Sequence, residues 1–178
     1  RFLDPIYIDV SGFPNGSGLP SPPGPVDYRS VWDAKRAVLL AAFKSTANSE
    51  PIPPALRRFA TFEAIAEKLA TSDWTKWPTE LRHPDDPGVA AFAVRHRETI
   101  EFHAFLQRLA DQQLAEAAAS ARRDGLSLGF YRDLAVGAAP DGAEAWSAQD
   151  TLMRGVSVGA PPDPFATQGQ IWCLPPPD

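Results

Sequence analysis

The chain has 178 residues, of which 44% are hydrophobic and 22% are charged, as in a soluble globular protein with its own core. Its formal net charge is −5, and no cluster of Lys and Arg interleaves with aromatic residues, which argues against a nucleic-acid partner. No apolar run approaches the ~20 residues that cross a bilayer, so no membrane partner is expected.

Prolines are concentrated at the two ends of the chain. Nine of the 19 fall within residues 1–54 and seven within residues 140–178. Because proline fixes φ and removes a backbone donor, both ends are expected to be loops that normally pack on something else. Residues 1–27 therefore read as an extended, proline-rich lead-in, in which Ile6–Val10 has the composition of a short strand or extended segment.

Helical periodicity dominates the middle of the chain. The apolar spacing predicts helices over about residues 28–44, 54–70 and 89–124. Asp27 or Ser30 is expected to cap the first helix, and Gly125 to end the last. Trp74–Pro78 predicts an aromatic cluster packed between helices, and a short helical turn is expected over residues 79–82.

Residues 126–136 follow the last helix and are largely apolar, which predicts a buried parallel strand. A helix, a glycine and a buried strand in this order make half of a β/α unit. Arg132 and Asp133 interrupt the apolar run, and burying an unpaired charge is costly. A structural Arg–carboxylate pair and a role in a site explain these two residues equally well.

The segment Gly159–Trp172 is too rich in Gly and Pro for a helix and shows no strand alternation, so a loop is expected. It carries Asp163, Gln170 and Trp172. A tryptophan ring offers an apolar face on which a sugar can stack, while the Gln and Asp side chains can bond to sugar hydroxyls. Composition alone favours a simpler interpretation, a surface loop held by one buried tryptophan.

The single cysteine and the histidines give no sign of a metal site. Cys173 cannot form an intrachain disulfide, which fits a reducing, cytoplasmic location. The three histidines are too few and too poorly spaced to hold a metal, so neither a metal nor another cofactor is expected.

Several segments, taken in order, resemble the 4-α-glucanotransferase family, also called amylomaltase or disproportionating enzyme (glycoside hydrolase family 77). Any one of them is weak evidence, but their order and spacing match along the whole chain. The segments are Phe2–Val10, Glu101–Gln107, Gly129–Val136, Asp141–Trp146, Gly155–Phe165 and Gly169–Trp172.

The resemblance implies an elaborated (β/α)8 barrel with inserted helices. A barrel needs ~250 residues, so this chain is expected to be a partial barrel only: mainly α with a few short strands, a helical insertion plus one early β/α unit. The implied parts are the lead-in at 1–27, the helical insertion at 28–88, a long helix and barrel strand at 89–146, and a substrate-cleft loop at 147–178.

The family carries its nucleophilic Asp, its acid/base Glu and a third Asp in motifs of the types Arg-x-Asp-His, Glu-Asp-Leu-Gly and His-Asp-x-x-Thr. None of these motifs is present in this sequence. The resemblance therefore implies a fragment of an α-1,4-glucan transferase that lacks catalytic residues and pairs with the remainder of the parent barrel. Transfer would pass through a covalent glycosyl-enzyme, which needs a carboxylate pair about 5 Å apart.

The residues that match the family's substrate cleft are Asp133, Asp163, Gln170 and Trp172. The first resembles an aspartate of the active-site wall, and the others resemble residues in or beside a mobile loop over the cleft. Two positions depart from the family pattern: Cys173 stands where the family has Gly, and Asp4 where it has Asn. A Cβ at position 173 is expected to strain a backbone that needs φ > 0.

Two other functions remain open from the sequence. The chain can be a non-catalytic carbohydrate-binding or helical interaction module that keeps Trp and Gln for binding. A self-contained hydrolase using Asp133 with Glu144 or Asp141 is disfavoured, because these groups crowd one strand and its following loop.

Overall fold

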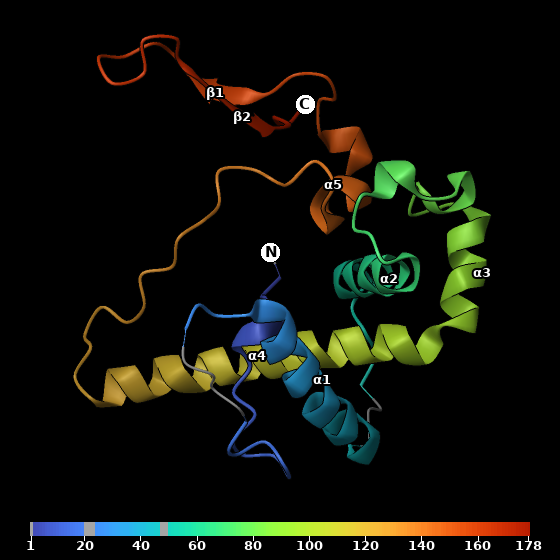
Figure 1. The fold of residues 1–178 in the computed structure, drawn as a ribbon, viewed down its shortest axis with the longest axis vertical. Coiled ribbons are helices and arrows are strands. Elements are labelled where there is room, and N and C mark those ends of the chain that lie inside the picture. The colour runs from blue at the N-terminus through green and yellow to red at the C-terminus, as the bar shows by residue number, and fades with distance from the viewer. Residues whose placement is uncertain (1, 20–23, 47–49) are drawn as a thin grey trace. The chain divides into compact units, whose positions relative to one another are not determined.

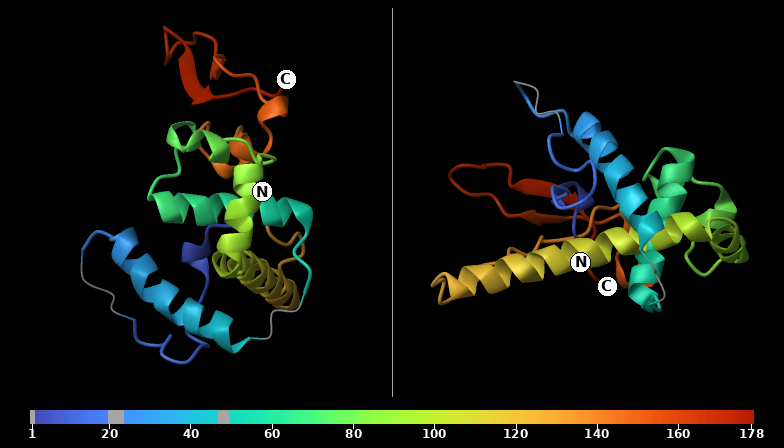
Figure 2. Two further views of the ribbon diagram at one scale, coloured as in Figure 1. Left: turned by 90° about the vertical axis from the view of Figure 1, so that its right-hand side faces the viewer. Right: turned by 90° about the horizontal axis from the view of Figure 1, so that it is seen from below.

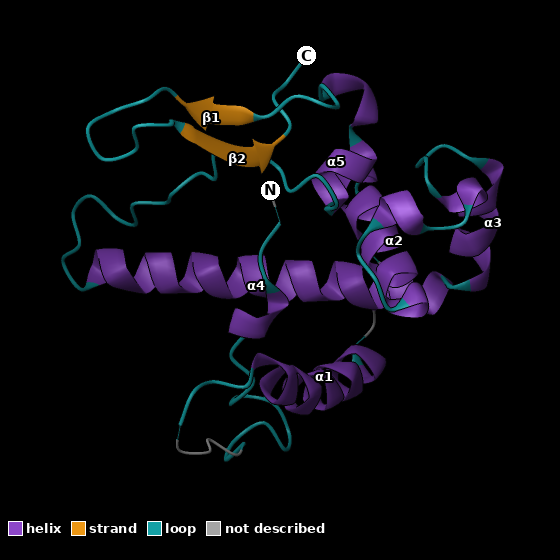
Figure 3. Cartoon of the chain, turned by 45° about the horizontal axis from the view of Figure 1, so that its top comes forward, coloured by secondary structure: helices purple, strands orange, loops and turns teal. Residues whose placement is uncertain are grey.

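The computed structural model describes residues 2–19, 24–46 and 50–178. Figure 3 shows that helices and loops make up most of this part, with one small two-stranded sheet. None of the described helices is long and apolar enough to cross a membrane. The elements are η1 (Pro5–Tyr7), α1 (Tyr28–Ser45), α2 (Pro54–Leu69), η2 (Trp74–Lys76), η3 (Thr79–Leu81), α3 (Pro87–Arg95), α4 (Arg97–Arg123), α5 (Ala143–Ser147), η4 (Gln149–Thr151), β1 (Val158–Ala160) and β2 (Gln170–Leu174).

The chain divides into two compact units. Unit 1 comprises Arg1–Pro53 and Glu101–Tyr131, and unit 2 comprises Pro54–Ile100 and Arg132–Asp178. Helix α4 therefore belongs mostly to unit 1, with its first turn in unit 2.

Unit 1 is built on the packing of α1 against α4 (Figure 1). The Phe43 ring of α1 meets the Phe102 and Phe105 rings of α4, with 5.6 Å between centroids in each case. Asp27 caps α1 by accepting hydrogen bonds from the backbone N–H groups of Arg29 and Ser30, as the sequence predicts. The predicted helix over residues 28–44 is thus confirmed.

The N-terminal segment lies on this helix pair without forming a strand. Pro5–Tyr7 is a 3-10 turn, so the prediction of a short strand or extended segment over Ile6–Val10 is wrong for Ile6 and Tyr7, and residues 8–10 form no strand. The backbone N–H and C=O of Leu3 both bond to the Gln107 amide, at 2.8 and 2.7 Å. Those of Asp9 bond to the Gln113 amide, both at 2.8 Å. Side chains of α4 thus supply the partners that a neighbouring strand would provide.

Unit 2 has an aromatic core. The rings of Phe62, Trp77 and Trp146 lie 5.1 to 6.0 Å apart, and both tryptophans are buried. Their indole N–H groups donate to backbone carbonyls, Trp77 to Thr71 at 3.0 Å and Trp146 to Leu81 at 3.1 Å. The aromatic cluster predicted around Trp74–Pro78 is confirmed, as is the predicted helix over residues 54–70.

The predicted helix over residues 89–124 is interrupted at His96. Helix α3 ends at Arg95, His96 adopts φ −116° and ψ 30°, and α4 begins at Arg97. The His96 ring stacks on Phe92 with 4.2 Å between centroids. Both halves keep helical periodicity, so the apolar pattern alone does not reveal a break of one residue. At the far end Gly125 takes φ +99° and ends α4, as predicted.

The prediction of a buried strand over residues 126–136 is wrong for this chain. The segment is a loop, visible as the long trace that leaves α4 (Figure 3), and Leu128 is 97% exposed. A strand requires a neighbour to complete its hydrogen bonds. Among the described residues no other strand pairs with this segment, so its apolar side chains are left facing solvent.

We expect Gln107→Ala to lower the free energy of unfolding by about 1–2 kcal/mol, because it leaves the backbone groups of Leu3 without their partners. Urea denaturation followed by circular dichroism measures this change. The matched control is Gln112→Ala, which removes only an exposed bond to Glu116 on the same helix and is expected to cost about 0.2–0.5 kcal/mol. Equal losses in the two variants would contradict the role given to Gln107.

Candidate functional site

The prediction of a simple loop over Gly159–Trp172 is wrong at both of its ends, which form an antiparallel hairpin (Figures 1 and 2). Gly159 pairs with Ile171 and Ala160 with Gln170. Strand alternation was hidden because the paired stretches are short and separated by a Pro-rich turn. A Cβ on Gly159 would lie 2.1 Å from the Gln170 carbonyl oxygen, so only glycine permits this close pairing.

A β-bulge interrupts the hairpin at Trp172, which is predicted to bind sugar, and at Cys173. Val158 pairs with Leu174 and Gly159 with Ile171, so Trp172 and Cys173 have no counterpart on β1. A bulge of this kind bends a strand and redirects its side chains. Cys173 accommodates it with φ +56°, in the left-handed region that favours glycine. This agrees with the expectation that a Cβ at position 173 is strained.

Gln170 and Trp172 are brought together on one face of β2. The Trp172 indole Nε1–H donates to Gln170 Oε1 at 2.9 Å. Trp172 is 40% exposed, so part of the ring remains open to solvent. The hydrogen bond uses the acceptor of the Gln170 amide and fixes the amide beside the ring. An apolar ring face next to an oriented amide is the combination that a sugar ring requires.

Asp163 organises the turn between the strands. Its Oδ1 accepts hydrogen bonds from the backbone N–H groups of Phe165 and Ala166, both at 2.7 Å. Its own N–H donates to the Ala166 carbonyl at 3.1 Å. This is the local side-chain bonding by which aspartates stabilise turns. The sequence did not predict this structural role, and the predicted role in sugar binding remains a prediction.

Asp133 and Arg132 lie in the exposed segment before α5. Neither forms an ion pair or a side-chain hydrogen bond with another of the residues that the structure describes. The structural Arg–carboxylate pair is therefore not formed here. Within the described ranges Asp133 forms no hydrogen bond with Gln170 or Trp172, and of the four predicted residues only these two are joined by a hydrogen bond.

The base of the hairpin is fixed to unit 2 by paired backbone. The Met153 N–H donates to the Pro176 carbonyl at 2.9 Å, and the Asp178 N–H donates to the Thr151 carbonyl at 3.0 Å. Residues of this paired backbone also border a cavity of about 350 Å³, whose lining includes Trp74, Arg154 and Cys173. The guanidinium of Arg154 lies over the Trp74 ring. The sequence did not point to Arg154, because Trp74 lies far earlier in the chain and no local pattern joins the two residues.

Charged groups near the cavity are held by local hydrogen bonds. Asp73 caps η2 and accepts from the Thr75 N–H, and Lys76 lies 2.8 Å from its carboxylate. The hydrogen bond and charge of Lys76, helped by Thr75, lower the pKa of Asp73 from its usual value. Asp73 therefore stays ionised at neutral pH as a cap and not as a proton donor.

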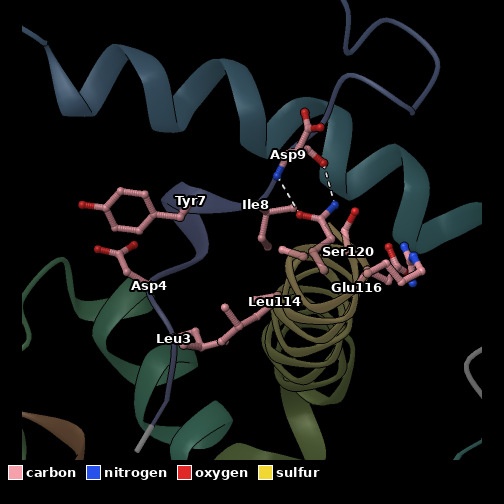
Figure 4. Close-up of a pocket in the computed structure, with 12 residues that line it drawn as sticks. Leu3, Asp4, Tyr7, Ile8, Asp9, Leu114, Glu116 and Ser120 are labelled. Atoms are coloured by element: carbon pink, nitrogen blue, oxygen red, sulfur yellow. Dashed lines mark hydrogen bonds between the residues drawn. The ribbon is translucent and has the colours of Figure 1, made fainter. Parts of the chain in front are cut away.

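Unit 1 contains a separate groove of about 720 Å³ between the N-terminal segment and α4 (Figure 4). Its carboxylates are engaged in local structure. Asp4 accepts from the Ile6 N–H, and Asp9 accepts from both the N–H and the hydroxyl of Ser11. The backbone bond from Ser11, with its hydroxyl, lowers the pKa of Asp9. The groove holds none of the predicted site residues.

Comparison with known proteins finds one family along the whole chain. The family model described as 4-alpha-glucanotransferase (glycoside hydrolase family 77) matches residues 1–178. A 4-alpha-glucanotransferase of Mycobacterium tuberculosis is 40% identical over 99% of this chain, and the chain spans 28% of that relative's length.

Solved structures agree with the family model. An amylomaltase from Corynebacterium glutamicum is 29% identical, with a TM-score of 0.72 over 99% of this chain and 27% of its own. An amylomaltase from Streptococcus agalactiae in complex with acarbose is 21% identical and shares the fold, with a TM-score of 0.76 over 98% of this chain and 40% of its own.

We expect Cys173→Gly to raise the stability of unit 2 by about 1 kcal/mol, because glycine adopts φ +56° without the steric cost of a Cβ. Thermal unfolding followed by tryptophan fluorescence measures the change. Cys173→Ala is the matched control, since it removes the thiol and keeps the Cβ, and it should give no gain. A stabilisation of equal size in both variants would show that the thiol, and not the backbone, is the source.

Proposed function

The chain belongs to the 4-alpha-glucanotransferase family, glycoside hydrolase family 77, and on that basis we propose that the protein carrying it transfers maltooligosaccharyl units between α-1,4-glucans. The reaction proceeds through a covalent glycosyl-enzyme, which requires a nucleophilic carboxylate and an acid/base carboxylate. This chain has none of the family's catalytic motifs. Its part is to form one wall and one loop of the substrate cleft, and on its own it is inactive.

The remainder of the parent barrel is the physical partner of this chain. Two observations support this part of the proposal: the chain spans 28% of the mycobacterial relative, and residues 126–136 expose apolar side chains that a barrel interior and its outer helices would cover. In the complete barrel, residues 126–136, which form a loop in this chain, would become the early barrel strand, with residues 28–88 as a helical insertion. Asp133 lies in that strand and faces the cleft once the barrel is complete.

The pairing of Gln170 with Trp172 is the observation that carries the assignment of a glucan site. The Trp172 ring lies on an exposed hairpin and is held by its bond to Gln170 Oε1. A glucose ring stacks on the indole face while the Gln170 amide donors bond to its hydroxyls. Since the amide is already oriented, binding costs less side-chain entropy than it would with a free glutamine.

The turn between β1 and β2 closes over the bound glucan. Asp163 holds the tip of this turn in shape through Phe165 and Ala166. A closed loop excludes water from the glycosyl-enzyme until an acceptor sugar arrives, which favours transfer over hydrolysis. Asp163 contributes its remaining carboxylate oxygen to the glucan in that closed state.

We expect the purified chain to release no glucose from maltotriose, because its sequence has none of the family's catalytic carboxylate motifs. A coupled glucose assay measures this, with the longer parent protein as the positive control. Glucose release by the chain alone would contradict the assignment of the catalytic residues to the rest of the barrel.

We expect Trp172→Ala to lower the affinity of the chain for maltotriose at least about tenfold, because stacking on the ring supplies much of the contact area. Isothermal titration calorimetry measures the affinity. Tyr28→Ala is the control, since Tyr28 is an exposed aromatic residue that belongs to unit 1 and is not among the proposed site residues. Equal losses in the two variants, or none in either, would argue against the glucan site.

A further inference from the structure

Arg154 lies where the chain enters the hairpin, between η4 and β1. Its guanidinium carbon lies 5.0 Å from the centroid of the Trp74 ring. A guanidinium over the face of a tryptophan is a cation–π contact, and Trp is the strongest of the aromatic partners. Trp74 is buried in the core of unit 2, so the contact joins an exposed loop to a fixed surface.

A second contact fixes the other side of the guanidinium. Arg154 Nη2 donates a hydrogen bond to Gln149 Oε1. The Gln149 amide in turn donates to the backbone carbonyls of Arg82, at 2.6 Å, and Trp146, at 3.1 Å. These carbonyls belong to the end of η3 and to α5, which surround the aromatic core. The guanidinium is therefore held by a ring face and by an amide that are themselves anchored.

Trp74 also holds the loop that follows the Asp133 segment. Its indole Nε1–H donates to the Pro140 carbonyl at 3.0 Å. Close by, a Cβ on Gly137 would lie 3.1 Å from the Leu174 side chain, so the loop packs directly on β2. One tryptophan thus contacts both segments that carry proposed cleft residues, through its ring face and its N–H.

We propose that Arg154 is a positioning residue for the β1–β2 hairpin. By bridging Trp74 and Gln149 it sets the direction in which β1 and β2 leave the core. It acts on Gln170 and Trp172 through the hairpin and does not itself contact glucan. The expected effect of Arg154 on glucan binding rests on the function proposed above. The positioning of the hairpin by Arg154 does not depend on that function. A planar, forked side chain is needed, because only arginine can stack and bond to Gln149 at the same time.

The single cysteine provides a direct probe of the hairpin. Cys173 is exposed, lies in the bulge beside Trp172, and lines the same cavity as Arg154. Its labelling rate by 5,5′-dithiobis(2-nitrobenzoate) at a fixed pH reports how freely the hairpin admits the reagent. Comparing Arg154→Ala with Arg154→Lys, which keeps the charge, separates the loss of charge from the loss of the planar contact.

In Arg154→Ala we expect the labelling rate of Cys173 to rise about threefold or more, as a contact of this kind is lost. Arg154→Lys keeps the charge but not the planar fork, and should give an intermediate rate. Arg58→Ala is the matched control, because Arg58 is an exposed arginine of unit 2 that bonds to Asp85 and to the Ser147 carbonyl. It should label like the unsubstituted chain.

An unchanged labelling rate in Arg154→Ala, or an equal rise in Arg58→Ala, would overturn the positioning role. Calorimetry with maltotriose then adds the functional test: affinity should fall about three- to tenfold in Arg154→Ala and remain unchanged in Arg58→Ala. Faster labelling in a chain that never binds maltotriose would support the positioning role while removing the proposed glucan site. The two proposals therefore fail in distinguishable ways.

Discussion

The demand of extended backbone for hydrogen-bond partners governs how this chain is organised. Each backbone N–H and C=O that leaves water must be paired, and a strand normally finds its partners on a neighbouring strand. The N-terminal segment meets this demand through the amides of Gln107 and Gln113. The C-terminal region meets it by pairing β1 with β2. Residues 126–136 pair with no strand among the described residues and remain a solvent-exposed loop.

This difference explains why one part of the candidate site is formed and another is not. Gln170 and Trp172 lie on a hairpin that completes its own hydrogen bonds, so their relative geometry is fixed locally. Asp133 lies on a segment that pairs with no strand among the described residues, so its geometry is not fixed in this way. Of the proposed cleft residues, Gln170 and Trp172 are therefore already held together, while a role for Asp133 rests on the proposed parent barrel.

The sequence predicts what depends on near neighbours along the chain. The helices α1 and α2 and the stop at Gly125 follow from apolar spacing, Asp27 and a glycine, all local signals. The break at His96 and the hairpin pairing depend on contacts that spacing does not encode. The family resemblance singled out Gln170 and Trp172, but nothing in the local pattern indicated that Asp163 shapes the turn.

The aromatic core of unit 2 is connected to the β1–β2 hairpin through contacts of Trp74. The Trp74 indole is buried, yet its N–H bonds to the loop at Pro140 and its face carries Arg154 at the entrance to the hairpin. Packing that stabilises the unit therefore also limits the directions open to the loop. The bulge at Cys173 borders the same cavity as Arg154, and there a left-handed residue redirects β2. Trp172 directly precedes this residue, so its orientation depends on residues that need never touch a sugar.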